Sequence, residues 1–316
     1  MKRTLILSLG LVLLSVTGFS QEEVVLSQLH DHKTVLTEDE PLNFPELQEE
    51  EKIRFAPQDE PLTGAKQDQV YLLKPKVDIP ITVVGAAWSL YAFTKIYSKE
   101  DMPASKVMAL NPADVNGFDR GAAGNTNQKA SDNSDYLFYG AMPLPIVLMA
   151  DRKIRQDALK VGFLYLEAFA ITGLLYTGSV YFTDRIRPET YNTNIPVSDR
   201  VNGNNQNAFF AGHPALVATS TFFCAKVYND YHPESPWRWV FFGGAAVATG
   251  TTAYLRHIAG KHFPTDQIVG VTVGTLAGIL VPHLHKNKNF NRQAWNIGPS
   301  MNYRGEGMGL AFTYRF

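Results

Sequence analysis

The chain has 316 residues and a formal net charge of −1, and it is 45 % hydrophobic and 12 % aromatic. This near-neutral charge gives no basis for attraction to a polyanion, so we expect no nucleic-acid partner. The single cysteine, Cys224, excludes a disulfide within the chain. The length allows one or two domains, and the composition suits either a large buried core or a membrane protein.

The N-terminal segment predicts a secretory signal peptide over residues 1–20. Lys2 and Arg3 precede an apolar stretch over residues 5–16, and small residues end the segment. A first membrane anchor is the alternative, but the apolar run is short for one. We therefore expect a chain that is exported into a bacterial cell envelope.

Residues 21–78 are polar and acidic, which predicts a mostly disordered spacer. Six apolar segments follow, and their lengths favour helices over strands. They cover residues 79–98, 135–150, 158–182, 213–229, 237–254 and 266–284, with prolines in the connections. We therefore predict that residues 79–285 form an all-α domain, a bundle of about six helices.

The last part of the chain, residues 286–316, has a different character. Apolar residues alternate over 310–316, and a Gly-Glu-Gly sequence separates them from residues 297–303. This pattern predicts a short C-terminal β-hairpin. Its final phenylalanine is similar to the last strand of outer-membrane proteins, although one hairpin cannot close a barrel. A strand pair packed on the helical domain is the alternative.

Three short runs, far apart in the sequence, carry side chains suited to phosphate chemistry. Arginines can bind phosphate oxygens with two N–H groups, and two histidines can serve as nucleophile and proton donor. An aspartate four residues after a histidine can hold that imidazole in one tautomer. The runs are Arg187-Pro188, Gly212-His213, and Arg256 with His262 and Asp266. Each lies where an apolar segment begins or ends, so helix N-termini would add to the anion site.

In this order, the three runs resemble the superfamily of type 2 phosphatidic acid phosphatases and vanadium haloperoxidases. The resemblance covers about residues 79–285 and includes NAFFAGHPA over 207–215 and TAYLRHIAGKHFPTD over 252–266. The first two runs are 26 residues apart, from Arg187 to His213, and the next step to an arginine is 43 residues. The second step leaves room for two membrane-length helices, as the fold of that superfamily requires.

The resemblance implies a role for each matching residue. His262 would be the nucleophile that forms a phosphohistidine, Asp266 would orient its ring, and His213 would protonate the leaving oxygen. The phosphoryl oxygens would be bound by Arg187, Arg256 and the Gly212 amide. No metal or other cofactor is expected, because arginines and helix ends supply the positive field.

Three positions depart from the family pattern. Val180 stands where a lysine is expected, and Ala211 and Leu255 stand where serines are expected. Arg185 or Lys261 could supply the missing charge. The nucleophile, the acid and the orienting carboxylate are all present, so we expect an active enzyme.

The sequence therefore predicts a metal-independent phosphatase that acts on a phosphomonoester or pyrophosphate, with a cell-envelope lipid as the expected substrate. A non-catalytic envelope scaffold on the same fold and a vanadium-dependent haloperoxidase are the alternatives. The positive residues Arg152, Lys153 and Arg155 favour an extracytoplasmic site on a membrane-associated enzyme. A soluble periplasmic bundle remains the alternative, because charged residues interrupt the apolar segments.

Overall fold

The computed structural model describes residues 69–288, 295–301 and 308–314. The predicted signal peptide, 1–20, and nearly all of the predicted spacer, 21–78, lie outside these residues. The long helices are α2 (Pro75–Ile96), α4 (Gln128–Ala141), α7 (Ala158–Phe182), α9 (Gly212–Tyr231), α10 (Trp237–Ile258) and α11 (Pro264–His285). The short ones are α3 (Ala104–Met108), α5 (Leu144–Val147), α6 (Arg152–Gln156) and α8 (Val197–Arg200). Five 3₁₀ turns lie at Pro112–Asp114, Arg120–Ala122, Leu148–Ala150, Pro188–Tyr191 and Gly203–Gln206.

The structure differs from the sequence prediction in two segments. Helix α2 begins at Pro75 rather than at residue 79, so the helical domain reaches into the predicted spacer. The segment predicted as one helix over 135–150 is broken after Ala141. Pro143 and Pro145 follow that break, and proline has no N–H to donate to a continuing helix.

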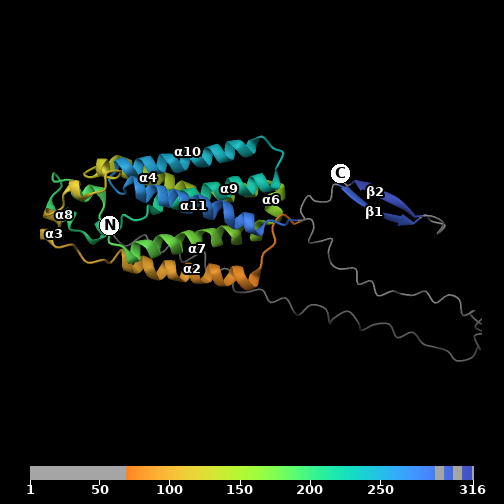
Figure 1. The fold of residues 1–316 in the computed structure, drawn as a ribbon, viewed down its shortest axis with the longest axis horizontal. Helices are drawn as coiled ribbons and strands as arrows, with labels where there is room; N and C mark the ends of the chain where they lie inside the picture. The colour runs from red at the N-terminus through yellow and green to blue at the C-terminus, as the bar shows by residue number, and fades with distance from the viewer. Residues whose placement is uncertain (1–68, 289–294, 302–307, 315–316) are drawn as a thin grey trace, which may run out of the picture. The chain divides into compact units, whose positions relative to one another are not determined.

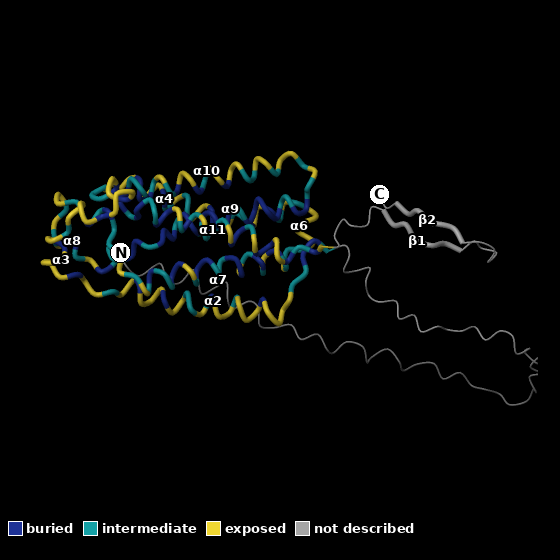
Figure 2. Tube along the Cα trace, viewed as in Figure 1, coloured by how far each residue is buried: buried dark blue, intermediate teal, exposed yellow. Residues whose placement is uncertain are grey.

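Helix α9 is the centre of the helical domain, with α7, α10 and α11 around it and α2 alongside α7 (Figure 1). Most of its residues are buried on every side, from Pro214 and Ala215 to Asp230 and Tyr231. Exposed residues are concentrated instead along the outer helices α2 and α10 (Figure 2). A helix that is buried on all sides needs apolar or small residues on every face. This explains why the sequence of α9 is rich in Ala and Thr.

A stripe of glycines brings α11 against α9. Gly270, Gly274 and Gly278 recur every four residues on one face of α11. A Cβ atom on Gly274 would lie 2.0 Å from the carbonyl oxygen of Ala215, and a Cβ on Gly270 would lie 2.4 Å from that of Ala211. Only glycine allows the two backbones to approach this closely. The stripe therefore fixes the start of α11 beside the start of α9.

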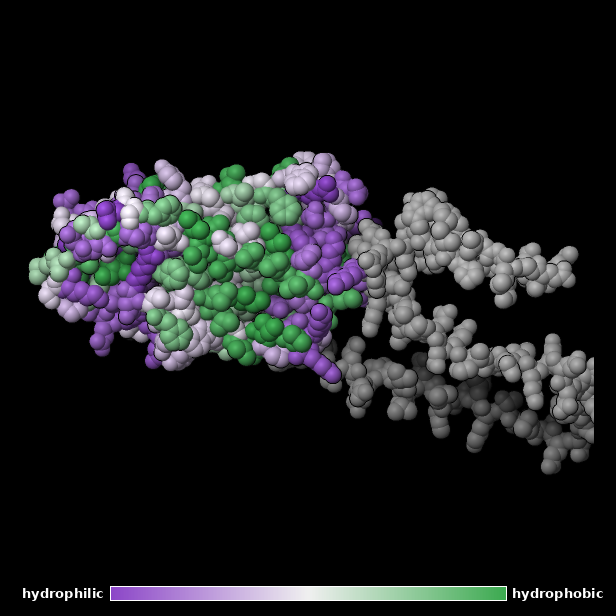
Figure 3. Space-filling model, in the orientation of Figure 1, coloured by the Kyte–Doolittle hydropathy of each residue, from purple (hydrophilic) through white to green (hydrophobic). Residues whose placement is uncertain are grey.

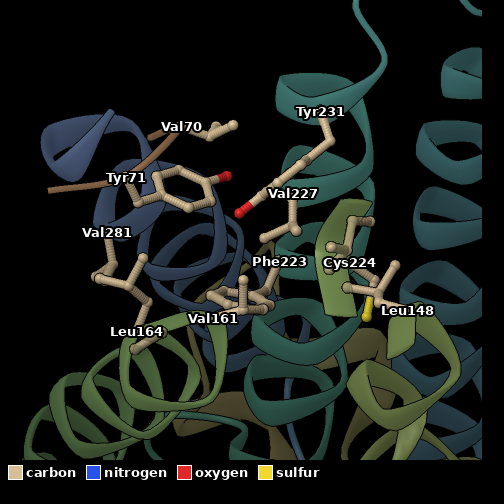
Figure 4. Close-up of a cluster of buried hydrophobic side chains, with 12 residues drawn as sticks. Val70, Tyr71, Leu148, Val161, Leu164, Phe223, Cys224, Val227, Tyr231 and Val281 are labelled. Atoms are coloured by element: carbon tan, nitrogen blue, oxygen red, sulfur yellow. The ribbon is translucent and has the colours of Figure 1, made fainter. Parts of the chain in front are cut away.

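The hydrophobic core lies toward the other end of α9 and α11 (Figure 4). Tyr71, Phe223 and Leu164 are fully buried there, and the Tyr71 hydroxyl donates to Asp230 at 2.9 Å. The chain segments before α2 and after α11 also pair at this end. The Leu72 amide donates to the carbonyl of His285 at 2.9 Å, which ties the two ends of the helical domain together.

Hydrophobic atoms form a band across the middle of the helical domain, with more hydrophilic ends (Figure 3). Three helices, α2, α7 and α11, are long and apolar enough to cross a membrane. Exposed apolar side chains on α2, such as Ile81, Val83 and Val84, contribute to this surface. Such a surface is compatible with membrane association.

Two C-terminal strands, β1 (Trp295–Met301) and β2 (Met308–Tyr314), pair antiparallel. Trp295 is opposite Tyr314, and Met301 is opposite Met308. These bounds begin earlier than the sequence pattern suggested, because β1 includes Trp295 and Asn296.

Candidate active site

Four helices begin or end on the side of the helical domain that is opposite the core cluster. Helices α7 and α10 finish here, and α9 and α11 begin here (Figure 1). Backbone hydrogen bonds join their connections. The Glu189 amide donates to the carbonyl of Gly260 at 2.9 Å, and the Ala211 amide donates to that of Asp266 at 3.0 Å. The three runs identified in the sequence therefore meet in one place.

Gly260 turns the chain between α10 and His262. Its φ is +71°, and a Cβ atom at this position would lie 1.8 Å from the carbonyl oxygen of Asn125. Both the dihedral angle and the lack of space require glycine. This turn brings His262 back beside the last turn of α10, which carries Arg256.

His262 is buried, and its Nδ1 lies 2.7 Å from the carbonyl oxygen of Ala208. A carbonyl can only accept, so Nδ1 carries the proton and Nε2 keeps its lone pair when the ring is neutral. Burial, together with the charges of Arg256 and Arg187, holds the pKa of His262 well below its usual value. Burial and the two cations therefore favour the neutral ring, in which Nε2 keeps a lone pair.

His213, the second residue of α9, shares a carboxylate with Arg256. Its Nε2 lies 3.0 Å from Oδ1 of Asp135, and a guanidinium nitrogen of Arg256 lies 3.4 Å from the same oxygen. The hydrogen bond from His213 lowers the pKa of Asp135. Burial lowers the pKa of His213 to about 4, against the opposing effect of Asp135.

Three cations approach the histidines. Arg256 and Arg187 are both close enough to His262 to lower its pKa, and Lys261 carries a similarly lowered pKa because of burial. Lys261 pairs with both carboxylate oxygens of Glu189, at 2.7 and 2.8 Å. The Nε atoms of Arg187 and Arg256 are buried, and neither has a hydrogen-bond partner among the described residues. Two buried arginine donors thus lie unmatched at the candidate site.

Gly212 begins α9 next to His213. A Cβ atom on Gly212 would lie 2.6 Å from the ring of Tyr176 on α7. A glycine therefore lets the start of α9 approach α7 closely, and the first amides of any helix lack partners within the helix.

Asp266 and Arg185 differ from their predicted roles. The Asp266 carboxylate accepts from the amide of Phe263 at 2.8 Å and pairs with Arg185 at 2.6 Å, whereas the ring of His262 is held by Ala208. Arg185 also pairs with the fully buried Asp119 at 2.6 Å. Asp266 thus fixes the turn that carries His262 rather than its imidazole, and Arg185 is committed to two carboxylates. Lys261 is likewise paired, with Glu189, so both candidates for the missing family charge hold a carboxylate.

Two of the departures from the family pattern fall inside the packed core. Val180 is fully buried beside Ile96 and Tyr176. Its carbonyl oxygen accepts from Lys99 at 2.8 Å, so a lysine from another segment reaches the end of α7. Ala211 is also fully buried, with its backbone bonded to Asp266.

Sequence reasoning missed several residues of this site. Asp135, Ser134 and Glu189 contact the predicted residues, and the Ala208 carbonyl holds His262. Ser134 and Asp135 lie on α4, more than a hundred residues from Arg256 along the chain, so no local motif links them. Every residue has a backbone carbonyl, so the sequence does not indicate which carbonyl contacts His262.

A polar cavity of about 420 Å³ adjoins the site. Glu189 and Lys261 form part of its wall, whereas His213, His262 and both site arginines, Arg187 and Arg256, do not line it. The other lining residues are mostly amides and hydroxyls, including Ser198, Asn202, Asn204 and Asn205.

Residues 161–290 match the sequence profile of the PAP2 superfamily. The match spans α7 to the end of α11 and contains all three runs that form the site. This match supports membership of residues 161–290 in the type 2 phosphatidic acid phosphatase superfamily, whose members are generally phosphatases. No curated protein and no solved structure matches the chain.

Proposed function

We propose that this protein is a phosphatase that hydrolyses a phosphomonoester or pyrophosphate through a phosphohistidine on His262. The observation that carries this proposal is the pair of buried, unmatched guanidinium donors on Arg187 and Arg256 beside a neutral His262. Buried donors without partners are costly, and a phosphoryl group would satisfy them. The first amides of α9, at Gly212, add a further cradle for the anion.

The reaction would proceed in two steps. The Nε2 lone pair of His262 attacks phosphorus, and the bond between phosphorus and the leaving oxygen breaks. His213 gives its proton to that oxygen. A water then attacks the phosphohistidine and returns a proton to His213, and inorganic phosphate leaves. The negative charge of bound substrate raises the pKa of His213, so the ring is protonated when the acid is needed.

The substrate is proposed to be a lipid phosphate of the cell envelope. The apolar band around α2, α7 and α11 supports membrane association. The polar cavity beside Lys261 would accommodate a polar group attached near the phosphate. We also propose that the protein is exported and localised in the cell envelope, as the sequence predicts.

The experiment is an assay of phosphate release from a panel of lipid phosphates, with the full chain purified in detergent. A phosphomonoester lipid, a pyrophosphate lipid and a water-soluble phosphomonoester should separate the substrate classes. Vanadate, which can adopt the five-coordinate geometry of phosphorus in the transition state, should inhibit the reaction. If no member of the panel is hydrolysed and vanadate does not bind, the non-catalytic scaffold replaces the enzyme.

A vanadium-dependent haloperoxidase would hold vanadate on the same histidine. Bromide oxidation by hydrogen peroxide, measured with the vanadate-loaded protein, tests this alternative directly. We expect phosphatase activity without peroxidase activity, because the site already offers a proton donor and a nucleophile for phosphoryl transfer.

A further inference from the structure

A second group of ionisable side chains lies buried at the far end of the helical domain. Asp78 is in the first turn of α2, Glu167 is in α7, and His285 is the last residue of α11. Their ligand-type atoms all lie within 4.8 Å of one another. The candidate active site is at the opposite end of α11, where Asp266 lies in the first turn, so the two groups are separate.

The three side chains direct one polar atom each toward a common point. Nδ1 of His285 lies 2.7 Å from the carbonyl oxygen of Val281, so Nδ1–H donates to that carbonyl. Nε2 faces Oδ1 of Asp78, 3.1 Å away, and Oε2 of Glu167, 3.7 Å away. Oε2 of Glu167 is buried, and in the described part of the chain it has no hydrogen-bond partner. One ring nitrogen and two carboxylate oxygens therefore face one another in a buried position.

We propose that Asp78, Glu167 and His285 bind a divalent metal ion, with Zn²⁺ as the preferred ion. One imidazole and two carboxylates form a ligand set that suits Zn²⁺, and Mn²⁺ is the nearest competitor. Burying two carboxylates next to the ring nitrogen of His285 is costly, and a divalent cation would neutralise their charge. Metal binding draws the three ligand atoms together to the bond lengths that the ion requires.

The surrounding contacts hold the ligands in the orientation that a metal needs. The Val281 carbonyl fixes the ring of His285, which is the usual outer contact of a metal-bound histidine. The amide of Lys74 donates to Oδ2 of Asp78, which leaves Oδ1 directed at the other two ligands. Glu167 needs no such contact, because the packing of α7 against α2 and α11 confines it.

The ion would act as a structural clamp on three helices. Helix α2 contacts mainly α7, and it is the most exposed of the three apolar helices. A metal bound by α2, α7 and α11 joins α2 to the rest of the bundle at the end where the chain enters it. Its free energy of binding adds to the stability of the folded state and not to phosphoryl transfer.

The test uses the full chain, purified in detergent without a histidine tag and stripped with EDTA. The protein is reloaded separately with Zn²⁺ and Mn²⁺, desalted and analysed by plasma mass spectrometry, and its thermal unfolding is followed. We expect about one tightly held Zn²⁺ per chain and an unfolding temperature that rises on loading. Retention of Mn²⁺ but not Zn²⁺ would overturn the choice of ion.

Matched variants locate the bound ion. His285→Gln and Glu167→Gln should lose the ion and the rise in unfolding temperature, whereas His283→Gln, an exposed histidine on the same helix, should keep both. Equal metal content in all three variants would place the ion elsewhere and overturn the site. A wild-type chain that binds no ion and is unaffected by EDTA would also overturn it, and direct contacts between His285 and the two carboxylates would then replace the metal. The unfolding measurement on wild-type protein is decisive even if a variant does not fold.

Discussion

The Nδ1 atom of His262 lies 2.7 Å from the carbonyl oxygen of Ala208, a residue 54 positions earlier in the chain. This contact selects the tautomer that leaves Nε2 free. It also joins the turn before α11 to the loop before α9, which carries His213. The orientation of the nucleophile therefore depends on a backbone atom, and the Asp266 carboxylate acts one step away by fixing the turn.

Replacing His262 by alanine should abolish turnover, because no other described group supplies a neutral imidazole between Arg187 and Arg256. Wild-type protein mixed rapidly with ³²P-labelled substrate and quenched in alkali should carry an acid-labile label that His262→Ala lacks. His257→Ala, a half-buried histidine in the last turn of α10 with no predicted catalytic role, is the control and should keep the label. Normal labelling of His262→Ala would disprove the nucleophile assignment.

The activity should have an acidic optimum. Burial lowers the pKa of His213 to about 4, so the free protein holds this ring neutral near neutral pH. As the pH falls toward that value, the fraction of protonated acid rises, and kcat/KM rises with it until His262 is also protonated. In His213→Ala the rise should vanish, with a loss of about 10²–10⁴-fold for substrates with poor leaving groups. A wild-type optimum above neutral pH would contradict this assignment.

We expect Lys261 to contribute to function and Arg185 to contribute to the stability of the fold. Lys261→Ala should raise KM by about tenfold, because a charge that faces the phosphate site is lost. Arg185→Ala leaves the buried Asp119 and Asp266 without their partner and should cost about 3–5 kcal/mol of folding free energy. Chemical denaturation and steady-state kinetics on both variants measure the two effects. Equal loss of stability in both would contradict the separation.

The close contact between α9 and α11 should tolerate no added carbon. A Cβ atom on Gly274 would lie 2.0 Å from the Ala215 carbonyl, so Gly274→Ala should destabilise the fold by about 1–3 kcal/mol. Gly250→Ala on α10 is the matched control, because nothing lies within 4 Å of its Cβ and alanine favours the helix. Thermal unfolding in detergent compares the two. A Gly274→Ala protein as stable as Gly250→Ala would mean that the helices pack differently.

The structure sets a topology that labelling can test. The site and the α9–α10 turn lie at opposite ends of the helical domain, so a domain that crosses the membrane exposes them on opposite sides (Figure 1). Single cysteines at Asn194 and Glu234, both exposed, should then react with an impermeant maleimide from different sides of intact cells. Cys224→Ala provides the background, because the native thiol is buried. Labelling of both from one side would instead indicate a domain that does not span.

The segment before α2 lies at the end opposite the site, where it pairs with the residues after α11. If the N-terminal segment is exported and the site is also extracytoplasmic, the chain must cross the membrane an even number of times between the two. A single crossing by α2 would place the site on the other side. The labelling experiment decides between an extracytoplasmic and a cytoplasmic site.

The sequence by itself determined the helical class of the fold and pointed to the residues that meet at the candidate site, whose catalytic roles stay a prediction. Long apolar segments bounded by prolines fix helices through local hydrogen bonding, so the bounds of α7 agree with the predicted range and those of α10 begin where expected. Motif spacing also identified His213, His262 and both arginines, because each lies at a helix end that the sequence itself marks.

Only the tertiary structure decided which partner each group takes. Three sets of contacts join segments that are far apart in the chain. They are the ion pairs of Arg185 with Asp119 and Asp266, the contact of Asp135 with His213, and the hydrogen bond between His262 and the Ala208 carbonyl. Such contacts depend on how helices pack, and helix packing here follows from close backbone approach at glycines. A backbone carbonyl has the same chemistry at every position, so no residue pattern could have indicated which one holds the nucleophile.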